Sequence, residues 1–418
     1  MQLAYGHGYL DVELPAHTTV INPSEKEGLP DEKQSLIAAL DSPIGSLSLR
    51  DQLRSGSSIC IVFTDITRST PNERLIPWIL DYLAASGVSR DQITLLNALG
   101  THRPNTREQL CTLLTPYVVE NYRVLNHEPE NPEAHVQFGV TSTGAPALIN
   151  KHLAQADVRI ITGFIEPHFF AGFSGGPKGI MPGVAALQTV ISNHGRRNIG
   201  SPNAAFGITT GNPIWEEMRD IALRIGTSFL VNVTLNERKA ITGIFAGDLI
   251  AAHEAGFEFV RASAMQPVSE PFDIVITTNS GYPLDQNLYQ AVKGMSAAAR
   301  IVRQGGAIII AAECRQGLPD GSPFDQLLRK AKDPEDILSL IAKESYPEQW
   351  QAQIQALIQR KASIYIYSSL SAPAVRAAHL QPCEDIAATV EKLCANINGI
   401  PRIAALPQGP LTIPYLPR

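Results

Sequence analysis

The sequence has 418 residues, of which 44% are hydrophobic and 18% are charged, and its formal net charge at pH 7 is -6. This composition is ordinary for a globular protein, and the acidic balance, with no basic stretch to offset it, argues against a nucleic-acid partner. The first residues lack the pattern of a secretory signal, and no apolar run approaches the roughly 18 residues that a membrane span needs. We therefore expect a cytoplasmic protein with no membrane partner.

The cysteines argue against a disulfide framework. Five are scattered along the chain without a Cys-x-x-Cys pair. An odd number in a long chain fits reduced thiols better than paired ones. Cys60 lies within an apolar run, and we interpret it as a small buried hydrophobe.

Short apolar runs alternate with helical patterns along the chain, which is typical of parallel strands joined by crossover helices. The predicted strands cover 59–63, 93–96, 158–161, 229–233, 274–277, 307–311 and 364–367. The predicted helices cover 75–85, 107–114, 214–225, 250–264, 288–302, 347–361 and 384–395. This order predicts an α/β protein whose two domains each have a Rossmann-like parallel sheet flanked by helices, with a cleft between them.

The predicted domain boundary is a polar stretch, broken by prolines, over 263–271. We predict an N-terminal α/β domain over 1–266, which would hold three loop histidines, and a C-terminal α/β domain over 267–398. The tail, 399–418, is extended and follows a helix. We expect it to return to the N-terminal domain as a second crossing.

The segment after the first predicted strand combines hydroxyls with a carboxylate and a guanidinium. At the carboxyl end of a parallel strand, Asp65 can accept hydrogen bonds from a ribose, and Arg68 offers the planar fork that suits a carboxylate. The alternative is that Asp65, Thr67 and Ser69 cap the helix that follows.

Three histidines lie at loop-like breaks of the pattern: His102, His168 and His194. A histidine can titrate near neutral pH or bind a metal, and loops at strand ends are where α/β proteins position chemistry. For His102, in the turn before a helix, the alternative is a turn residue whose hydrogen bonds are satisfied locally.

A glycine-rich stretch surrounds Lys178. Its glycines are Gly172, Gly175, Gly176, Gly179 and Gly183. We expect their backbone N–H groups to be available to an anion, with Lys178 supplying a positive charge or a nucleophilic amine. The stretch is not a Walker P-loop, because Gly179 stands where a Ser or Thr would bind magnesium, so ATP hydrolysis is not expected.

A further segment follows the strand that opens the second domain. Gln290 and Lys293 are three residues apart, so on a helix they share a face and could both point into the cleft. The alternative is the solvated start of a helix.

These segments together resemble the lactate racemase family of nickel-dependent 2-hydroxyacid racemases and epimerases. The resemblance covers the chain from Asp65 to about Trp350. It rests on Asp-Ile-Thr-Arg at 65–68, Ala-Leu-Gly-Thr-His-Arg-Pro at 98–104, Pro-His-Phe-Phe-Ala-Gly-Phe-Ser-Gly-Gly-Pro-Lys at 167–178, Asn-His at 193–194 and Tyr-Gln-Ala-Val-Lys at 289–293.

The resemblance implies a nickel-pincer nucleotide, the nickel complex of pyridinium-3-thioamide-5-thiocarboxylic acid mononucleotide. Lys178 would form the covalent thioamide link, and His194 would be the fourth ligand of a roughly square-planar nickel site, a geometry that suits sulfur and imidazole donors. The ribose and phosphate would be held by Asp65, Thr67, Gly175 and Gly176. Enzymes that synthesise this cofactor would be transient partners.

The resemblance also implies roles around a small 2-hydroxyacid substrate. His102 and His168 would be the acid/base pair, one for each enantiomer. Arg68 and Lys293, assisted by Gln290, would hold the carboxylate. Tyr289 and Trp350 could form an apolar wall that favours a short acid such as lactate, although a Trp in an amphipathic helix is also typical of core packing.

The chemistry implied is inversion of C2 through a 2-keto acid. A carbanion beside a carboxylate is costly, so removal of C2 hydrogen as a hydride, coupled to proton transfer from the hydroxyl, is the better route. Two other functions stay open from the residues. One is a non-catalytic, hinge-closing binder of an anionic nucleotide or hydroxyacid. The other is a nicotinamide-dependent dehydrogenase, which is disfavoured because no Gly-x-Gly-x-x-Gly follows an early strand.

Overall fold

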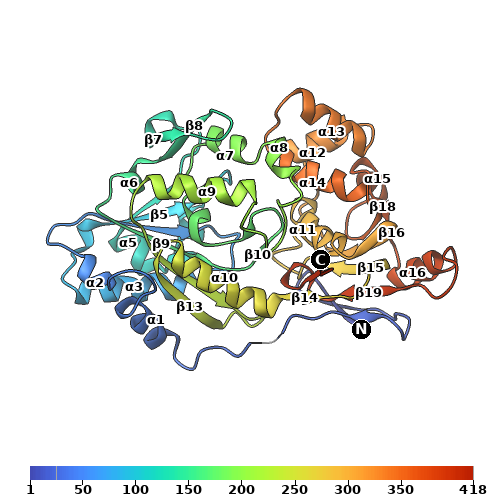
Figure 1. The fold of residues 1–418 in the computed structure, drawn as a ribbon, viewed down its shortest axis with the longest axis horizontal. Helices are drawn as coiled ribbons and strands as arrows, with labels where there is room; N and C mark the ends of the chain where they lie inside the picture. Colours follow the sequence, from blue (N-terminus) through green and yellow to red (C-terminus); the bar gives the residue numbers. More distant parts are fainter. Residues whose placement is uncertain (25, 418) are drawn as a thin grey trace. The chain divides into compact units, whose positions relative to one another are not determined.

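The computed structural model describes residues 1–24 and 26–417 and divides into two compact units (Figure 1). We call residues 25–194 and 203–262 the central unit. Residues 1–24, 195–202 and 263–418, which include both ends of the chain, form the terminal unit. Each unit is built on its own six-stranded sheet.

The sheet of the central unit has the order β13-β12-β9-β4-β5-β6. Its strands are β4 (Ile59–Thr64), β5 (Ile93–Ala98), β6 (Arg123–Asn126), β9 (Val158–Phe164), β12 (Phe229–Leu235) and β13 (Ile241–Asp248). All neighbours are parallel except β13, which runs antiparallel to β12. The inner strands are apolar on both faces, as expected for a parallel sheet covered by helices on each side.

Helices and short hairpins cover the sheet of the central unit. The helices are α1 (Glu32–Asp41), α2 (Leu49–Gln52), α3 (Asn72–Ala85), α4 (Arg107–Leu114), α5 (Pro116–Asn121), α6 (Lys151–Ala154), α7 (Leu187–Asn193), α9 (Pro213–Arg224) and α10 (Ala251–Ala264). The hairpins are β7 (His135–Val140) with β8 (Pro146–Asn150) and β10 (Pro167–His168) with β11 (Gly172–Phe173). Apolar residues of α1, α3 and α4 form one core with alternate residues of β4, β5 and β9.

The sheet of the terminal unit is parallel throughout, with the order β18-β17-β16-β15-β19-β3. Its strands are β3 (Thr19–Val20), β15 (Phe272–Thr278), β16 (Val302–Ala311), β17 (Ala362–Tyr367), β18 (Gln381–Pro382) and β19 (Ile403–Leu406). Two further pairs are β1 (Gln2–Tyr5) with β2 (Gly8–Asp11) and β14 (Met265–Pro267) with β20 (Ile413–Tyr415).

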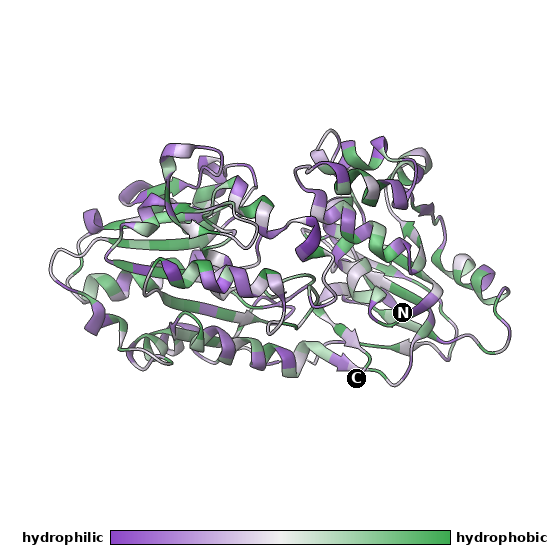
Figure 2. Cartoon of the chain, turned by 45° about the horizontal axis from the view of Figure 1, so that its top comes forward, coloured by the Kyte–Doolittle hydropathy of each residue, from purple (hydrophilic) through white to green (hydrophobic). Residues whose placement is uncertain are grey.

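The helices of the terminal unit are α8 (Arg196–Ile199), α11 (Leu288–Ala299), α12 (Pro323–Lys330), α13 (Pro334–Lys343), α14 (Gln349–Gln359), α15 (Ala372–Ala377) and α16 (Ile386–Cys394). In both units the sheet strands are mostly hydrophobic, whereas the helices carry hydrophobic and hydrophilic residues side by side (Figure 2). Among the described residues, no helix combines the length and apolarity of a membrane span.

The α/β class and all the predicted strands are confirmed, since each predicted range lies within an observed strand. The two ends of the chain differ from expectation. The tail was expected to return to the N-terminal domain, but it contributes β19, which pairs with β15 of the terminal unit. Residues 1–24, placed by sequence in the N-terminal domain, belong to the terminal unit because β3 pairs with β19. Segments this short carry too few residues for their periodicity to reveal the partner.

Candidate active site

Loops that follow β4, β5 and β9 carry the predicted polar residues of the central unit. In the strand order, β5 and β6 lie on one side of β4, and β9 and β12 lie on the other. The winding therefore reverses between β4 and β9, and open α/β sheets bind ligands at such a point, beyond the carboxyl ends of the strands. Asp65 directly follows β4, and His102 and His168 each lie four residues beyond β5 and β9.

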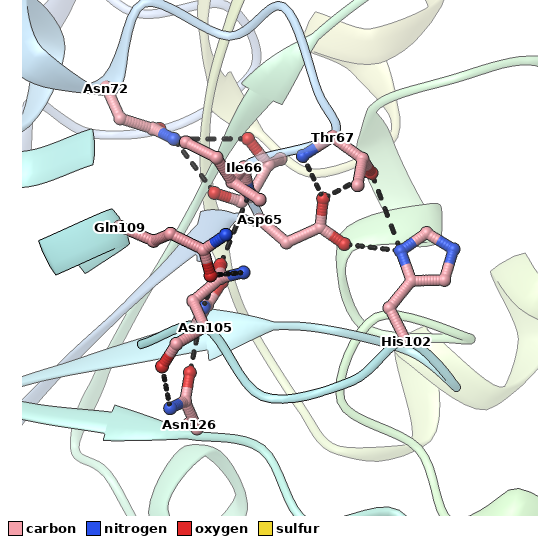
Figure 3. A network of polar contacts seen from close by, with 10 residues as sticks. Asp65, Ile66, Thr67, Asn72, His102, Asn105, Gln109 and Asn126 are labelled. Atoms are coloured by element: carbon pink, nitrogen blue, oxygen red, sulfur yellow. Dashed lines mark hydrogen bonds and ion pairs between the residues drawn. The ribbon is translucent and has the colours of Figure 1, made fainter. Parts of the chain in front are cut away.

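Asp65 and His102 form a hydrogen-bonded pair across two of these loops (Figure 3). The distance from His102 Nδ1 to Asp65 Oδ2 is 2.6 Å. The other carboxylate oxygen accepts the backbone N–H of Thr67 at 2.8 Å and its hydroxyl at 2.5 Å. The helix-capping alternative is wrong, because α3 is preceded by Pro71 and has no side-chain cap. The sequence had assigned Asp65 and Thr67 to a ribose, and it missed this contact with His102.

The Asp65 carboxyl is ionised although only 1% of the residue is exposed. Burial opposes ionisation, but the hydrogen bond and charge of His102, the charge of Arg68 and the hydrogen bond of Thr67 outweigh it, so the pKa of Asp65 lies well below its ordinary value. Because an ionised carboxylate can only accept, His102 must donate from Nδ1, which leaves the Nε2 lone pair as the basic position of the neutral ring.

Asparagines hold the loops that carry Asp65 and His102 (Figure 3). Asn97 donates from Nδ2 to the side-chain oxygens of Asn105 and Asn126, each at 2.9 Å. Asn105 Oδ1 also accepts the N–H of Ile66 at 3.2 Å, which links the loop after β5 to the loop after β4. Sequence reasoning missed these residues, because the sequence around an asparagine does not indicate which group its side chain will bond to.

His168 and His194 both pack against one aromatic ring. The centroid of the Phe170 ring lies 4.6 Å from that of His168 and 4.9 Å from that of His194, both in edge-to-face geometry. The N–H of Ala171 donates to His168 Nδ1 at 3.2 Å. The hairpin β10–β11 thus positions two of the three predicted histidines together.

The turn that carries Lys178 is held from two sides. The N–H of Gly176 donates to Asn232 Oδ1 on β12 at 2.7 Å, and His253 on α10 contacts the O of Ser174 through Nε2 at 2.9 Å. A Cβ on Gly176, where φ is +54°, would lie 2.4 Å from the His253 ring, and one on Gly175 would lie 2.3 Å from Asn232.

Close packing therefore explains the double glycine. The expectation that its N–H groups are available to an anion is wrong for Gly176, whose N–H is already bonded to Asn232. Sequence reasoning missed Asn232 and His253 because both come from elements far along the chain that pack beneath the turn.

His194 is a buried, neutral imidazole near a cation. Only 3% of it is exposed, and burial together with the charge of Lys178 lowers its pKa to about 3. Its Nδ1 lies 2.9 Å from Asn193 Oδ1. Within residues 1–24 and 26–417, no cluster of three or more His, Cys, Asp or Glu could hold a metal by itself.

The predicted substrate residues of the terminal unit lie on α11 and α14. Asn287 caps α11 and accepts the N–H of Gln290 at 3.0 Å, and both Gln290 and Lys293 are half-buried. Trp350, 5% exposed, donates from Nε1 to the hydroxyl of Tyr289 at 2.9 Å. The structure thus brings the two predicted wall residues together, with Trp350 packed into the core of the unit.

Comparison with known proteins identifies the family. Residues 5–207 match the model of the lactate racemase N-terminal domain, and residues 268–413 match that of the lactate racemase C-terminal domain. The chain is 36% identical over 384 residues to a lactate racemase from Thermoanaerobacterium thermosaccharolyticum, covering 90% of this chain and 89% of that protein. The chain belongs to the lactate racemase family. A second lactate racemase, from Lactiplantibacillus plantarum, is 37% identical over 384 residues and covers 90% of each chain.

Solved structures of similar fold agree with membership of the lactate racemase family. The lactate racemase apoprotein from T. thermosaccharolyticum superposes with a TM-score of 0.93 at 34% identity over 99% of both chains. A Thermotoga maritima protein shares the fold alone, with a TM-score of 0.73 at 19% identity over 94% of this chain and 100% of that one. The family predicted from the motifs at 65–68, 98–104, 167–178, 193–194 and 289–293 is therefore confirmed.

Proposed function

We propose that the protein is a lactate racemase that inverts C2 of lactate, or of a similarly short 2-hydroxyacid, with the help of a nickel-pincer nucleotide. The observation that carries this proposal is the Asp65–His102 pair beside the β4–β9 switch point, with His168 and His194 in the loops that follow β9 and α7. Relatives named lactate racemase, at 36% and 37% identity, support the reaction type.

The residues of the central unit fit the proposed cofactor. A neutral imidazole is a metal ligand, and burial keeps His194 neutral by lowering its pKa to about 3. Lys178, whose charge acts on His194, is the proposed covalent attachment point. When bound, the nickel-pincer nucleotide would accept the hydride from C2 and return it to the opposite face.

His102 is the base in this proposal. Its Nδ1–H is held by the Asp65 carboxylate, so Nε2 can take the proton of the substrate hydroxyl while Asp65 stabilises the imidazolium that forms. A positioned base of this kind contributes roughly 10²- to 10⁴-fold to the rate.

His168 is the partner that holds the proton for the other enantiomer. Because the N–H of Ala171 donates to its Nδ1, the neutral ring carries its proton on Nε2 and can donate a hydrogen bond to the substrate oxygen. To accept a proton at Nε2 in the opposite direction, His168 must first carry its own proton on Nδ1 instead, which requires release of the Ala171 N–H. The two histidines therefore enter the reaction in complementary tautomers.

Arg68 is the proposed anchor for the substrate carboxylate, together with Lys293 and Gln290. Among the described residues the Arg68 guanidinium has no hydrogen bond or ion pair, although its charge acts on Asp65. A guanidinium in this state can pair with a carboxylate in bidentate fashion. Tyr289 and Trp350 are proposed as the wall beside the 2-substituent, and their mutual hydrogen bond would fix its shape.

The experiment is production of the protein together with the enzymes that synthesise the cofactor, its proposed transient partners. We expect this protein to contain nickel, to carry an adduct mass on Lys178 and to interconvert D- and L-lactate. Protein from a host without those enzymes is the control and should do none of these. A loaded protein that binds lactate without interconverting its enantiomers would instead be the non-catalytic binder.

A further inference from the structure

Glu217 on α9 is a buried carboxylate that the proposed reaction does not use. It is 8% exposed and both of its oxygens are engaged. Oε1 accepts the N–H of Ser142 at 2.5 Å, and Oε2 accepts Nδ2 of Asn193 at 2.8 Å. Burying a carboxylate is costly unless it is well hydrogen-bonded, so its position next to the residue before His194 calls for an explanation.

Glu217 determines which way the Asn193 amide points. Nδ2 of Asn193 donates to Glu217 and also to the O of Ile214 at 3.2 Å. A carboxylate and a carbonyl can only accept, so the NH₂ end of Asn193 must face them. The carbonyl end, Oδ1, must then face Nδ1 of His194, which lies 2.9 Å away.

The orientation of Asn193 in turn decides the tautomer of His194. Oδ1 is an acceptor, so the neutral ring must carry its proton on Nδ1 and its lone pair on Nε2. Metal-bound histidines are commonly fixed in this way by a partner on the second ring nitrogen.

We propose that Glu217 is a positioning residue that acts through Asn193 to hold His194 in the tautomer whose Nε2 can ligate nickel. The inference rests on the proposed function for the identity of the metal. The hydrogen-bond relay itself is a property of the protein without cofactor. Through this relay, Glu217 on α9 determines the tautomer of the His194 ring by way of the Asn193 amide.

The tautomer can be measured directly in protein made without the cofactor. Selective ¹⁵N labelling of its 10 histidines gives ring-nitrogen resonances that distinguish Nδ1–H from Nε2–H, and His194→Gln assigns the signal of His194 by its disappearance. We expect wild-type His194 to be neutral at pH 7 with the proton on Nδ1. An Nε2–H tautomer, or a protonated ring, would overturn the proposal without any variant of Glu217.

Glu217→Gln tests the relay. The amide cannot accept from both Ser142 and Asn193, so Asn193 should turn in part of the molecules and His194 should become a mixture of tautomers. In protein made with the cofactor-synthesising enzymes, we expect the nickel content to fall by about tenfold. The matched control is Glu216→Gln, because Glu216 is the neighbouring residue on α9 and accepts the N–H of Gly211 at 2.7 Å instead.

A purely structural role for Glu217 gives a different result. It would lower the melting temperature of Glu217→Gln while leaving the tautomer of His194 and the nickel content as in Glu216→Gln, and that outcome overturns the proposal. Loss of racemisation in the wild type would contradict the proposed function alone, since the tautomer is read in protein without cofactor.

Discussion

The sheets of the two units each have six strands, and all of these are parallel to their neighbours except β13. The polar groups at the carboxyl edges of the two sheets nevertheless have different roles. In the central unit, Asp65 after β4 pairs with a histidine side chain. In the terminal unit, Asp285 after β15 accepts two backbone N–H groups, from Gly6 at 2.7 Å and from Glu313 at 3.0 Å. One carboxylate orients a group that can move a proton, and the other fastens loops together.

This difference shows that a strand end alone does not make a catalytic site. Asn279, the first residue after β15, accepts the N–H of Gly294, and Thr278 donates to the O of Pro407 at 3.0 Å. The polar side chains at that edge thus form hydrogen bonds with backbone groups. The edge of the central unit differs in bringing titratable side chains against one another, so its chemistry follows from side-chain pairing on a common scaffold.

The largest expected effect follows from removal of the proposed base. We expect His102→Gln to lower kcat for racemisation by about 10²- to 10⁴-fold in both directions, because His102 would take the hydroxyl proton of one enantiomer and return a proton when that enantiomer is formed from the other. Rates measured from D- and from L-lactate with equally nickel-loaded protein check this. Unchanged kcat in both directions would remove His102 from the reaction.

The two aspartates provide a direct contrast. Asp65→Asn should lower kcat by about 10²-fold with little change in melting temperature, since the amide no longer enforces Nδ1–H on His102. Asp285→Asn should leave kcat intact but cost about 1–3 kcal/mol of unfolding free energy, because a buried amide donor is left without a partner. Equal effects of the two variants on kcat would contradict the contrast between the edges.

The packing beneath Lys178 predicts a strong effect on stability. Gly176→Ala should cost about 2–4 kcal/mol, since the new Cβ meets the His253 ring at 2.4 Å and the residue has a positive φ. Gly56→Ala is the matched control: its φ is +80° but nothing lies within 4 Å, so about 1 kcal/mol is expected. Chemical denaturation measures both. A similar loss of unfolding free energy in the two variants would mean that the turn around Gly176 can shift to accommodate the new Cβ at little cost.

Two buried histidines of the central unit should make its stability depend on pH. Burial lowers the pKa of His127 and of His253 to about 4 each. Between the unfolded pKa of about 6.5 and the folded pKa, only the unfolded chain binds these protons. The free energy of unfolding therefore decreases as the pH is lowered through this range, by up to about 1.4 kcal/mol per pH unit for each histidine. His253→Gln should reduce this slope by one proton, as chemical denaturation at several pH values between these two pKa values would measure.

Much of the fold could be predicted from the sequence because the inner strands are long apolar runs. The ranges 59–63 and 158–161 lie within β4 and β9, and Asp65, His102 and His168 were correctly placed beyond strand ends. What the sequence missed depends on tertiary contacts. Asn232, Glu217 and His253 lie on regular elements, and only folding reveals that they support the loops around Lys178 and His194.

The ends of the sequence were harder to predict for the same reason. β3 has two residues and β19 has four, so neither shows a period. The double glycine was also misread in part. A pair of glycines is expected both in a turn that binds an anion and in a turn that is tightly packed against its neighbours. Only the position of Asn232, which accepts the N–H of Gly176, distinguishes the two cases.

The pairing of β3 with β19 sets an order for biosynthesis. Residues 19–20 are synthesised before their neighbour at 403–406, and the whole central unit lies between them in the sequence. Because domains fold as they emerge from the ribosome, the central unit can complete its sheet before β19, the neighbour of β3, has been synthesised. The terminal unit becomes whole only after residues 403–406 have been synthesised, so removal of these residues should leave β3 and β15 without the strand that joins them and favour degradation of the product.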